Sequence, residues 1–244
     1  MNQGRLDLDI KDAEYDPDSG KLIALLSDSR PNFGNTVVSI DPLTFHVSAL
    51  FSTTSDHNFL RLNSDHSRLY IATDSTVSIY DTTSFNLIGS IQPPAPRPEL
   101  AGDHLLVDLK ASPSAPETIA IVLRHIAFQV ADVFIYEDTK LLTRKLSDLV
   151  SIIEPPDIAF STAGDGLFVK TNRIQINLNK YLIDGSGFQS AEPGISAGTF
   201  NRSLRVKVGK IYVDEIAFDE QSLVITEAFD SINSEKTLID IDAN

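Results

Sequence analysis

The chain has 244 residues, and 42% of them are apolar, which is enough for a continuous core in one large domain. With 34 acidic side chains against 20 Lys and Arg, the formal charge is −14, so the attraction that drives binding to nucleic acids and anionic membranes is missing. No cysteine is present, which excludes disulfides, thiolate zinc sites and thiol catalysis.

The N-terminal part of the chain combines an acidic segment with a turn and a strand. YDPDSGKLIAL, from Tyr15 to Leu25, places Asp, Ser and Gly ahead of an apolar run, which is typical of a tight turn that enters a β-strand. A calcium loop beginning at Asp16 is the alternative, but the Asp-x-Asp-x-Asp-Gly series and the closing Glu are absent. We therefore predict a turn here and no metal site.

A strand, an Asp-initiated turn and a second strand follow, and the same pattern returns 40 residues later. Aligning Asp41 with Asp81 places VVSIDPLTFHV over VSIYDTTSFNL, and a third copy begins at Asp219. The Asp side chain of such a turn accepts hydrogen bonds from backbone N–H groups two or three residues on. The apolar residue four positions after the Asp is expected to fold back onto the strands.

The turn before the second strand of each unit also recurs. LNSDHSRLYIA, from Leu62 to Ala72, repeats the YDPDSGKLIAL pattern, and FSTAGDGLFVK and VGKIYV are further copies. The clearest unit predicts strands over 58–62, 68–72, 76–80 and 87–91, and no segment of ten or more residues has a helical period. The repeated apolar anchors, spaced by 47, 50, 48 and 44 residues, are Leu22, Leu69, Ile119, Leu167 and Ile211.

A period of this length, built from four short β-runs, predicts an all-β protein: a β-propeller of four-stranded blades, with about five blades visible. The predicted blades span about 11–51, 57–91, 104–146, 157–190 and 203–229. Residues 5–10 and 230–244 could supply closing strands, or the chain could form part of a larger propeller. An incomplete ring would expose sheet edges and would therefore favour oligomers.

The motifs resemble those of bacterial β-propellers with YVTN or NHL-type repeats. The resemblance is carried by DPDSGKLIAL, SDHSRLYIAT and GKIYV, followed by NTVVSIDPLTFHV and STVSIYDTTSFNL, and it covers about residues 11–229. It implies a non-enzymatic binding or interaction role within an exported or surface-associated bacterial protein, located outside the cell, in the periplasm or at the cell surface. Because these motifs are turn and core signals, they specify a fold and do not name a ligand.

Long, irregular loops indicate where recognition would occur. In a propeller, the loops from second to third strands and from fourth to first strands lie on one face, and here they are the long ones, over 27–35, 52–58, 92–104 and 123–131. We expect a protein, a small molecule or a carbohydrate as ligand, and no cofactor, nucleic acid or membrane insertion. The candidate binding residues on this face are Arg30, Asn32, Phe33, Asn35, His57, Arg124 and His125.

A propeller hydrolase or lyase, similar to lactonases, is the alternative function. His57 and His104 precede predicted inner strands and could approach the central channel, where a His beside an acid would act as a general base. The five histidines show no metal-ligand spacing, no G-x-S-x-G occurs, and no catalytic residue can be assigned. The enzyme hypothesis predicts convergent carboxylates with perturbed pKa values at the channel, whereas the binding hypothesis predicts an exposed apolar or aromatic patch around Phe33.

Overall fold

The computed structural model confirms the all-β fold: five antiparallel four-stranded sheets are arranged as the blades of a β-propeller. The structure describes residues 8–27, 35–53, 57–95, 103–128, 130–150, 155–172, 176–192, 194–197, 204–213, 216–223 and 225–228. The closing segment proposed at 230–244 lies outside the described residues, as do residues 5–7 of the other.

Each blade follows the chain in simple up-and-down order. Blade 1 contains β1 (Ile10–Asp16), β2 (Lys21–Leu26), β3 (Thr36–Ile40) and β4 (Val47–Ser52). Blade 2 contains β5 (Phe59–Leu62), β6 (Arg68–Ala72), β7 (Val77–Asp81) and β8 (Leu87–Ile91). Blade 3 contains β9 (His104–Ala111), β10 (Thr118–His125), β11 (Ala131–Glu137) and β12 (Lys140–Leu141), and the short 3-10 helix η1 (Leu146–Asp148) follows it.

The last two blades complete the series. Blade 4 contains β13 (Asp157–Phe160), β14 (Gly166–Asn172), β15 (Ile176–Asp184) and β16 (Gly187–Ala191), and β17 (Ile195–Ala197) pairs with the far end of β15. Blade 5 contains β18 (Leu204–Lys207), β19 (Lys210–Val213), β20 (Ile216–Asp219) and β21 (Ile225–Ala228).

The five anchors occupy one equivalent position in every blade. Each is the second residue of the second strand, and each pairs with a large apolar residue of the third strand. Because strand side chains alternate between the two faces of a sheet, this shared register directs equivalent positions into the cores between blades. The pairs are Leu22–Ile40, Leu69–Tyr80, Ile119–Tyr136, Leu167–Tyr181 and Ile211–Phe218.

The Asp-initiated turns close by local hydrogen bonds. Oδ1 of Asp41 accepts from the backbone N–H of Leu43 and Thr44, at 2.8 and 3.0 Å. Phe45, four residues after the Asp, adopts a left-handed conformation (φ 57°), as Phe85 does in the next blade (φ 53°). Phe85 packs on the ring of Phe51 in blade 1, whereas Phe45 remains half exposed, so only the former folds back onto neighbouring strands.

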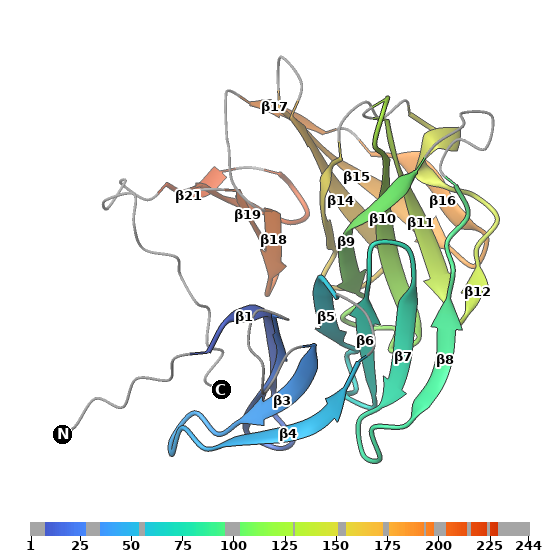
Figure 1. The fold of residues 1–244 in the computed structure, drawn as a ribbon. Helices are drawn as coiled ribbons and strands as arrows, with labels where there is room; N and C mark the ends of the chain where they lie inside the picture. Colours follow the sequence, from blue (N-terminus) through green and yellow to red (C-terminus); the bar gives the residue numbers. More distant parts are fainter. Residues whose placement is uncertain are drawn as a thin grey trace.

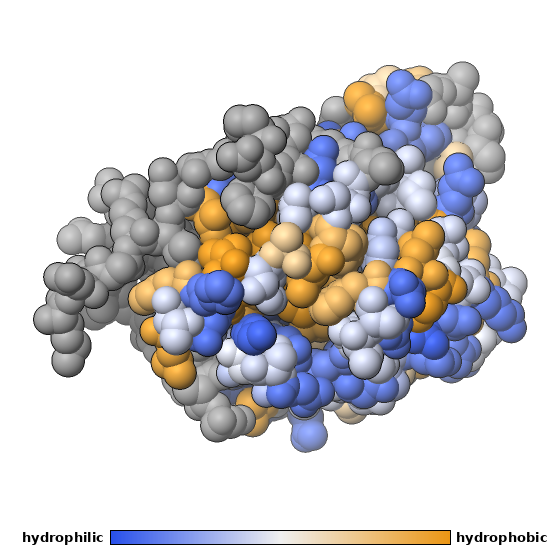
Figure 2. Space-filling view, turned by 60° about the horizontal axis from the view of Figure 1, so that its bottom comes forward, coloured by the Kyte–Doolittle hydropathy of each residue, from blue (hydrophilic) through white to orange (hydrophobic). Residues whose placement is uncertain are grey.

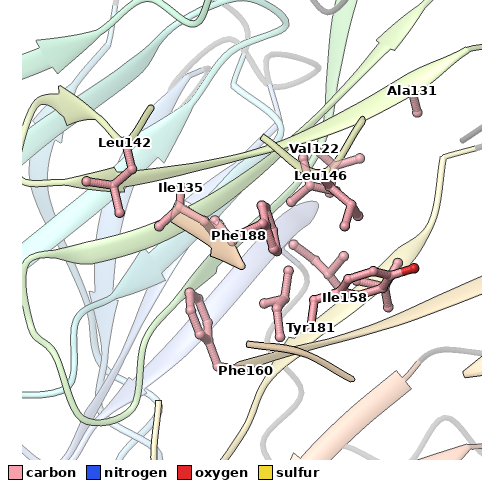
Figure 3. Close-up of a cluster of buried hydrophobic side chains, with 13 residues drawn as sticks. Val122, Ala131, Ile135, Leu142, Leu146, Ile158, Phe160, Tyr181 and Phe188 are labelled. Carbon is pink, nitrogen blue, oxygen red and sulfur yellow. The ribbon is translucent and has the colours of Figure 1, made fainter. Parts of the chain in front are cut away.

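The hydrophobic core is divided among the contacts between neighbouring blades. Separate buried clusters join blades 1 and 2, 2 and 3, 3 and 4, and 4 and 5. In the cluster between blades 3 and 4, Phe160 and Phe188 point toward Ile135 (Figure 3). Fully burying one such side chain contributes about 1.5–3 kcal/mol, so stacking against a neighbour stabilises each blade.

The first strands of adjacent blades contact one another around the centre, β1 with β5, β5 with β9, β9 with β13 and β13 with β18. In Figure 1, β1, β5, β9 and β18 lie toward the middle and β4, β8 and β21 lie outside. The tilted view of Figure 2 shows mainly hydrophilic residues along its lower edge, below a band of hydrophobic ones. Among the described residues, no helix is long and apolar enough to cross a membrane.

Candidate functional site

A hollow of about 510 Å³ lies at the long-loop end of blades 2 and 3. Four segments form its wall: the turn between β6 and β7, the segment after β8, the start of β9 and the end of β10. Two acidic residues, Asp74 and Asp103, line it together with His104. The apolar part of the wall includes Leu105 and Leu123. Polar and apolar groups therefore make up similar shares of the wall.

The turn that carries Asp74 is held from both sides. Thr73 Oγ1 accepts from the backbone N–H of Ser75 and Thr76, at 3.2 and 3.0 Å. The carbonyl of Asp74 accepts from the N–H of Leu106 in blade 3 at 2.6 Å, which ties the two blades together at the hollow. Asn58 Nδ2 donates to Asp74 Oδ1 at 2.5 Å and orients the carboxylate. Hydrogen bonds therefore hold both the turn and the carboxylate of Asp74 in place.

Two histidines meet edge to face beside the hollow. His104 of β9 and His125 of β10 are partners across the sheet, and their ring centroids are 4.9 Å apart. The ring of Phe128 lies 4.8 Å from that of His125, and the Phe128 N–H donates a long hydrogen bond of 3.4 Å to His125 Nδ1. These contacts fix both imidazoles, with His125 fully buried.

The proton affinity of His104 is reduced by its surroundings. Burial lowers the pKa of His104, the neighbouring His125 lowers it further, and Asp103 acts in the opposite direction. Nε2 of His104 is buried and has no hydrogen-bond partner among the described protein atoms. His104 is thus held as a neutral imidazole over a wider pH range than an exposed histidine, with one ring nitrogen unused.

An apolar rim borders the hollow on the blade 3 side. Ile126 lines the hollow and Phe128 follows two residues later on the same turn, with exposed fractions of 47% and 54%. The Ile126 N–H donates to the carbonyl of Asp103 at 3.1 Å, so the turn after β10 and the start of β9 hold each other. Large apolar groups exposed beside a cavity are a feature of contact surfaces.

The residues predicted from the long loops are only partly brought together. His125 contacts the wall of the hollow through His104, but Arg124 lies on the opposite face of β10, which is turned toward blade 4. His57 is buried just before β5, and the carbonyl of Asn35 accepts from Thr53. Arg30, Asn32 and Phe33 lie outside the described residues, and so does the patch predicted around Phe33. The site role of all seven remains a prediction.

A second polar site is the charged cluster on the inner strands, formed by Asp12, Glu14, Arg61, Asp108 and Lys110. Arg61 Nη1 lies 2.5 Å from Asp12 Oδ2 and 3.4 Å from Glu14 Oε1 in blade 1. Its Nε donates to the carbonyl of Leu109 in blade 3 at 3.0 Å. Lys110 Nζ lies 3.2 Å from Asp108 Oδ1. Arg61 of blade 2 therefore joins three consecutive blades at the centre.

The carboxyls of this charged cluster have perturbed proton affinities. Burial raises the pKa of Glu14, against the attraction of Arg61, which lowers it. Burial likewise raises the pKa of Asp108, and Lys110 and Arg61 oppose this. Burial lowers the pKa of Arg61, but Asp12 and Glu14 outweigh it, so the net shift is upward. Perturbed carboxyls beside a cation occur both in ion-pair networks and in active sites.

Asp16, Asp18 and His66 form a third polar group, on the short turns of blades 1 and 2. Each offers one ligand atom, and these atoms lie within 4.8 Å of one another. Oδ1 of Asp16 accepts from the Asp18 N–H at 3.1 Å, and Oδ2 accepts from Ser19 Oγ at 2.6 Å. These bonds are those of the turn predicted from the sequence, and they already use both oxygens of Asp16.

The sequence analysis missed Asp74, Asp103 and Arg61. Asp103 belongs to the long connection over 92–104, whereas Asp74 lies on the short turn between β6 and β7, and the only signal in the sequence was that both are acidic. Arg61 stands in FLRL, where one charged residue interrupts an apolar inner strand. A charge on a strand that must be buried indicates either a partner or a site.

The sheets and loops define the chain as a β-propeller protein. No family model and no curated protein matches its sequence. Among solved structures, a functionally unknown protein from Desulfotomaculum acetoxidans is similar, with 14% identity, a TM-score of 0.59, and coverage of 93% of this chain and 71% of that chain. A luciferin-regenerating enzyme is similar with 13% identity, a TM-score of 0.58, and coverage of 91% and 76%. At these identities the likeness shows the fold alone.

Proposed function

We propose that the protein is a non-enzymatic binding propeller that recognises its ligand in the hollow at the long-loop end of blades 2 and 3. The observation that carries this proposal is the convergence of Asp74, Asp103 and His104 on one cavity whose wall is part polar and part apolar. These groups come from two blades and are held by bonds between the blades, so the fold presents them in a defined geometry. Preorganised polar groups beside an apolar surface favour specific binding.

The sequence resemblance supports the same role. The motifs around Asp41 and Asp81 resemble YVTN or NHL-type repeats, and such propellers act as binding modules of exported or surface-associated bacterial proteins. We extend this role to the present chain, with a location outside the cell, in the periplasm or at the cell surface. A ligand-binding face made of loops on a rigid scaffold is consistent with it.

Filling the hollow tests this proposal directly. Ser75 is an exposed residue of its wall, so Ser75→Trp should obstruct the cavity without disturbing the core. A set of fragment-sized amines, acids, alcohols and sugars would be screened by NMR line broadening against the intact chain. We expect fragments that bind the wild type to be lost in Ser75→Trp.

Thr83→Trp is the matched control, because Thr83 is equally exposed on a turn of the opposite face of the same blade. It should retain every fragment that the wild type binds. Binding that is unchanged by Ser75→Trp, or absent for all fragments, would overturn the proposal.

The hydrolase or lyase alternative has one observation in its favour, the raised pKa of Glu14 and Asp108 beside Arg61. A carboxyl with a raised pKa keeps its proton to higher pH and can donate it, and a cation can hold a developing oxyanion. Turnover of lactones or aryl esters that is lost in Asp108→Asn and kept in Ser75→Trp would favour this alternative. Absence of turnover in the wild type would count against it.

A further inference from the structure

We propose that the hollow recognises a cationic group, an ammonium or a guanidinium, carried on an apolar or aromatic body. This inference rests on the proposed function, because it names the ligand class of the same site. A basic peptide side chain and a free small amine share this chemistry, and the experiment below separates them.

The charge of the wall is the first argument. Among the described residues that line the hollow, the ones with charged side chains at neutral pH are Asp74 and Asp103, and no Lys or Arg is among them. Asn58 orients Asp74 but, as a neutral amide, adds no positive charge to the wall. Two like charges in one concave site raise the local concentration of cations, and the net charge of −14 adds to this.

The shape of the wall is the second argument. Leu105 and Leu123 line the interior, and Ile126 stands at its edge. Phe128, half exposed on the same turn, extends the apolar surface beyond the cavity. A bare metal ion or a fully polar amine would leave these groups in contact with water. An organic cation places its charge at the carboxylates and its apolar body against this surface.

The imidazole pair is the third argument. The titratable and charged groups at the hollow are Asp74 on the turn after β6, Asp103 and His104 at the start of β9, and His125 at the end of β10. A neutral His104 carries no positive charge and so does not compete with a bound cation for the carboxylates. Because burial and His125 lower the pKa of His104, this neutral form persists to lower pH.

The experiment compares three probes of similar size by isothermal titration calorimetry on the intact chain. The probes are 2-phenylethylammonium, 2-phenylethanol and 3-phenylpropanoate, which differ in charge and share one aromatic body. A second arm compares a blocked peptide containing Leu-Lys-Leu with one in which norleucine replaces the lysine. The variants are Asp103→Asn and, as a control of equal charge change, Glu137→Gln at the exposed far end of β11.

We expect the ammonium probe to bind more tightly than the alcohol and the acid not to bind. Asp103→Asn should weaken ammonium binding about two- to fivefold, because Asp103 is exposed and an exposed ion pair contributes modestly. Glu137→Gln should leave it unchanged, and acidification through the pKa of His104 should weaken it. Tighter binding of the lysine peptide than of the free amine would identify a protein segment as the source, and the reverse would identify a small molecule.

Binding of the alcohol or the acid that equals or exceeds that of the ammonium probe would overturn the cation inference. If that binding is lost in Ser75→Trp, the proposed function survives with another ligand class. Equal weakening by Asp103→Asn and Glu137→Gln would also overturn the inference, because it would show a general effect of net charge. If no probe binds, the cation inference fails, and the fragment screen decides the proposed function.

Discussion

The hollow beside His104 and the charged cluster around Arg61 share blades 2 and 3, yet their charged groups differ in whether they have protein partners. In the charged cluster, Arg61 reaches Asp12, Glu14 and a backbone carbonyl of blade 3, so each charge meets a protein partner. In the hollow, Asp74 and Asp103 face no cation among the described lining residues. Buried charges must be paired for the fold to be stable, whereas exposed carboxylates need no partner. The charged cluster is therefore explained by folding, and the hollow is available to a ligand.

The largest effect that this comparison predicts is on stability. Arg61→Met should lower the free energy of unfolding by about 1.5–3 kcal/mol, because it leaves the partly buried carboxylates of Asp12 and Glu14 without the cation that contacts both. Arg68→Met is the control on the same blade: its partners Glu117 and Asp138 are about half exposed, so the loss should be about 1 kcal/mol or less. Urea denaturation measures the free energy of unfolding of both variants. Equal losses would show that the ion pairs of Arg61 contribute no more than the more exposed ion pairs of Arg68.

The next effect is on the pH dependence of stability. The pKa values of Glu14 and Asp108 are raised in the folded state, so between the unfolded and folded values the folded protein binds more protons. Their contribution is therefore favourable at lower pH and is lost as the pH rises through the folded pKa values. In the double variant Glu14→Gln, Asp108→Asn this decline should disappear.

Turn aspartates such as Asp41 and Asp81 oppose this trend. Backbone and side-chain hydrogen bonds lower their folded pKa values, so their contribution is lost as the pH falls. The difference between the wild type and the double variant cancels this shared background. Denaturation over a series of pH values measures it, and a difference that rises with pH would contradict the assignment.

The smallest effect belongs to the hollow. Asp103→Asn should change the free energy of unfolding by no more than about 0.5 kcal/mol, because Asp103 is exposed and its backbone carbonyl, which accepts from Ile126, is retained. Thermal denaturation compares the variant with the wild type. A loss as large as that of Arg61→Met would show that the acidic wall is structural and would remove the contrast between the two sites.

Much of the scaffold could be predicted from residues close together in the sequence. The anchors Leu69 and Ile119 recur because each second strand needs one apolar residue at the same register position, and a period reports that directly. Asp41 and Asp81 close turns in which the Asp side chain bonds to residues at most three positions on, so local chemistry is sufficient. The left-handed conformation of Phe45 was not predicted, because phenylalanine carries no signal for it.

From the sequence, the candidate site could be predicted only as one face of the propeller, and the residues that line the hollow could not. The long connections predicted the end of the blades at which the hollow lies, but the site role of that end stays a prediction. Arg124 and His125, adjacent in sequence, diverge to opposite sides of β10 because side chains alternate along a strand. Asp74 and Asp103 line the same hollow because the β6–β7 turn of blade 2 is hydrogen-bonded to β9 of blade 3. Nothing in either local segment indicates that contact.

The sequence by itself determined the repeat, the strand order within each blade and the Asp turns, because these depend on alternation and on hydrogen bonds within a few residues. Tertiary structure alone decided that Arg61 meets Asp12 and Glu14 at the centre, and that His104 meets His125 beside two carboxylates. Those contacts depend on how neighbouring blades stack and on which face each side chain takes. Stacking is set by the summed burial of many residues, so no single motif encodes it.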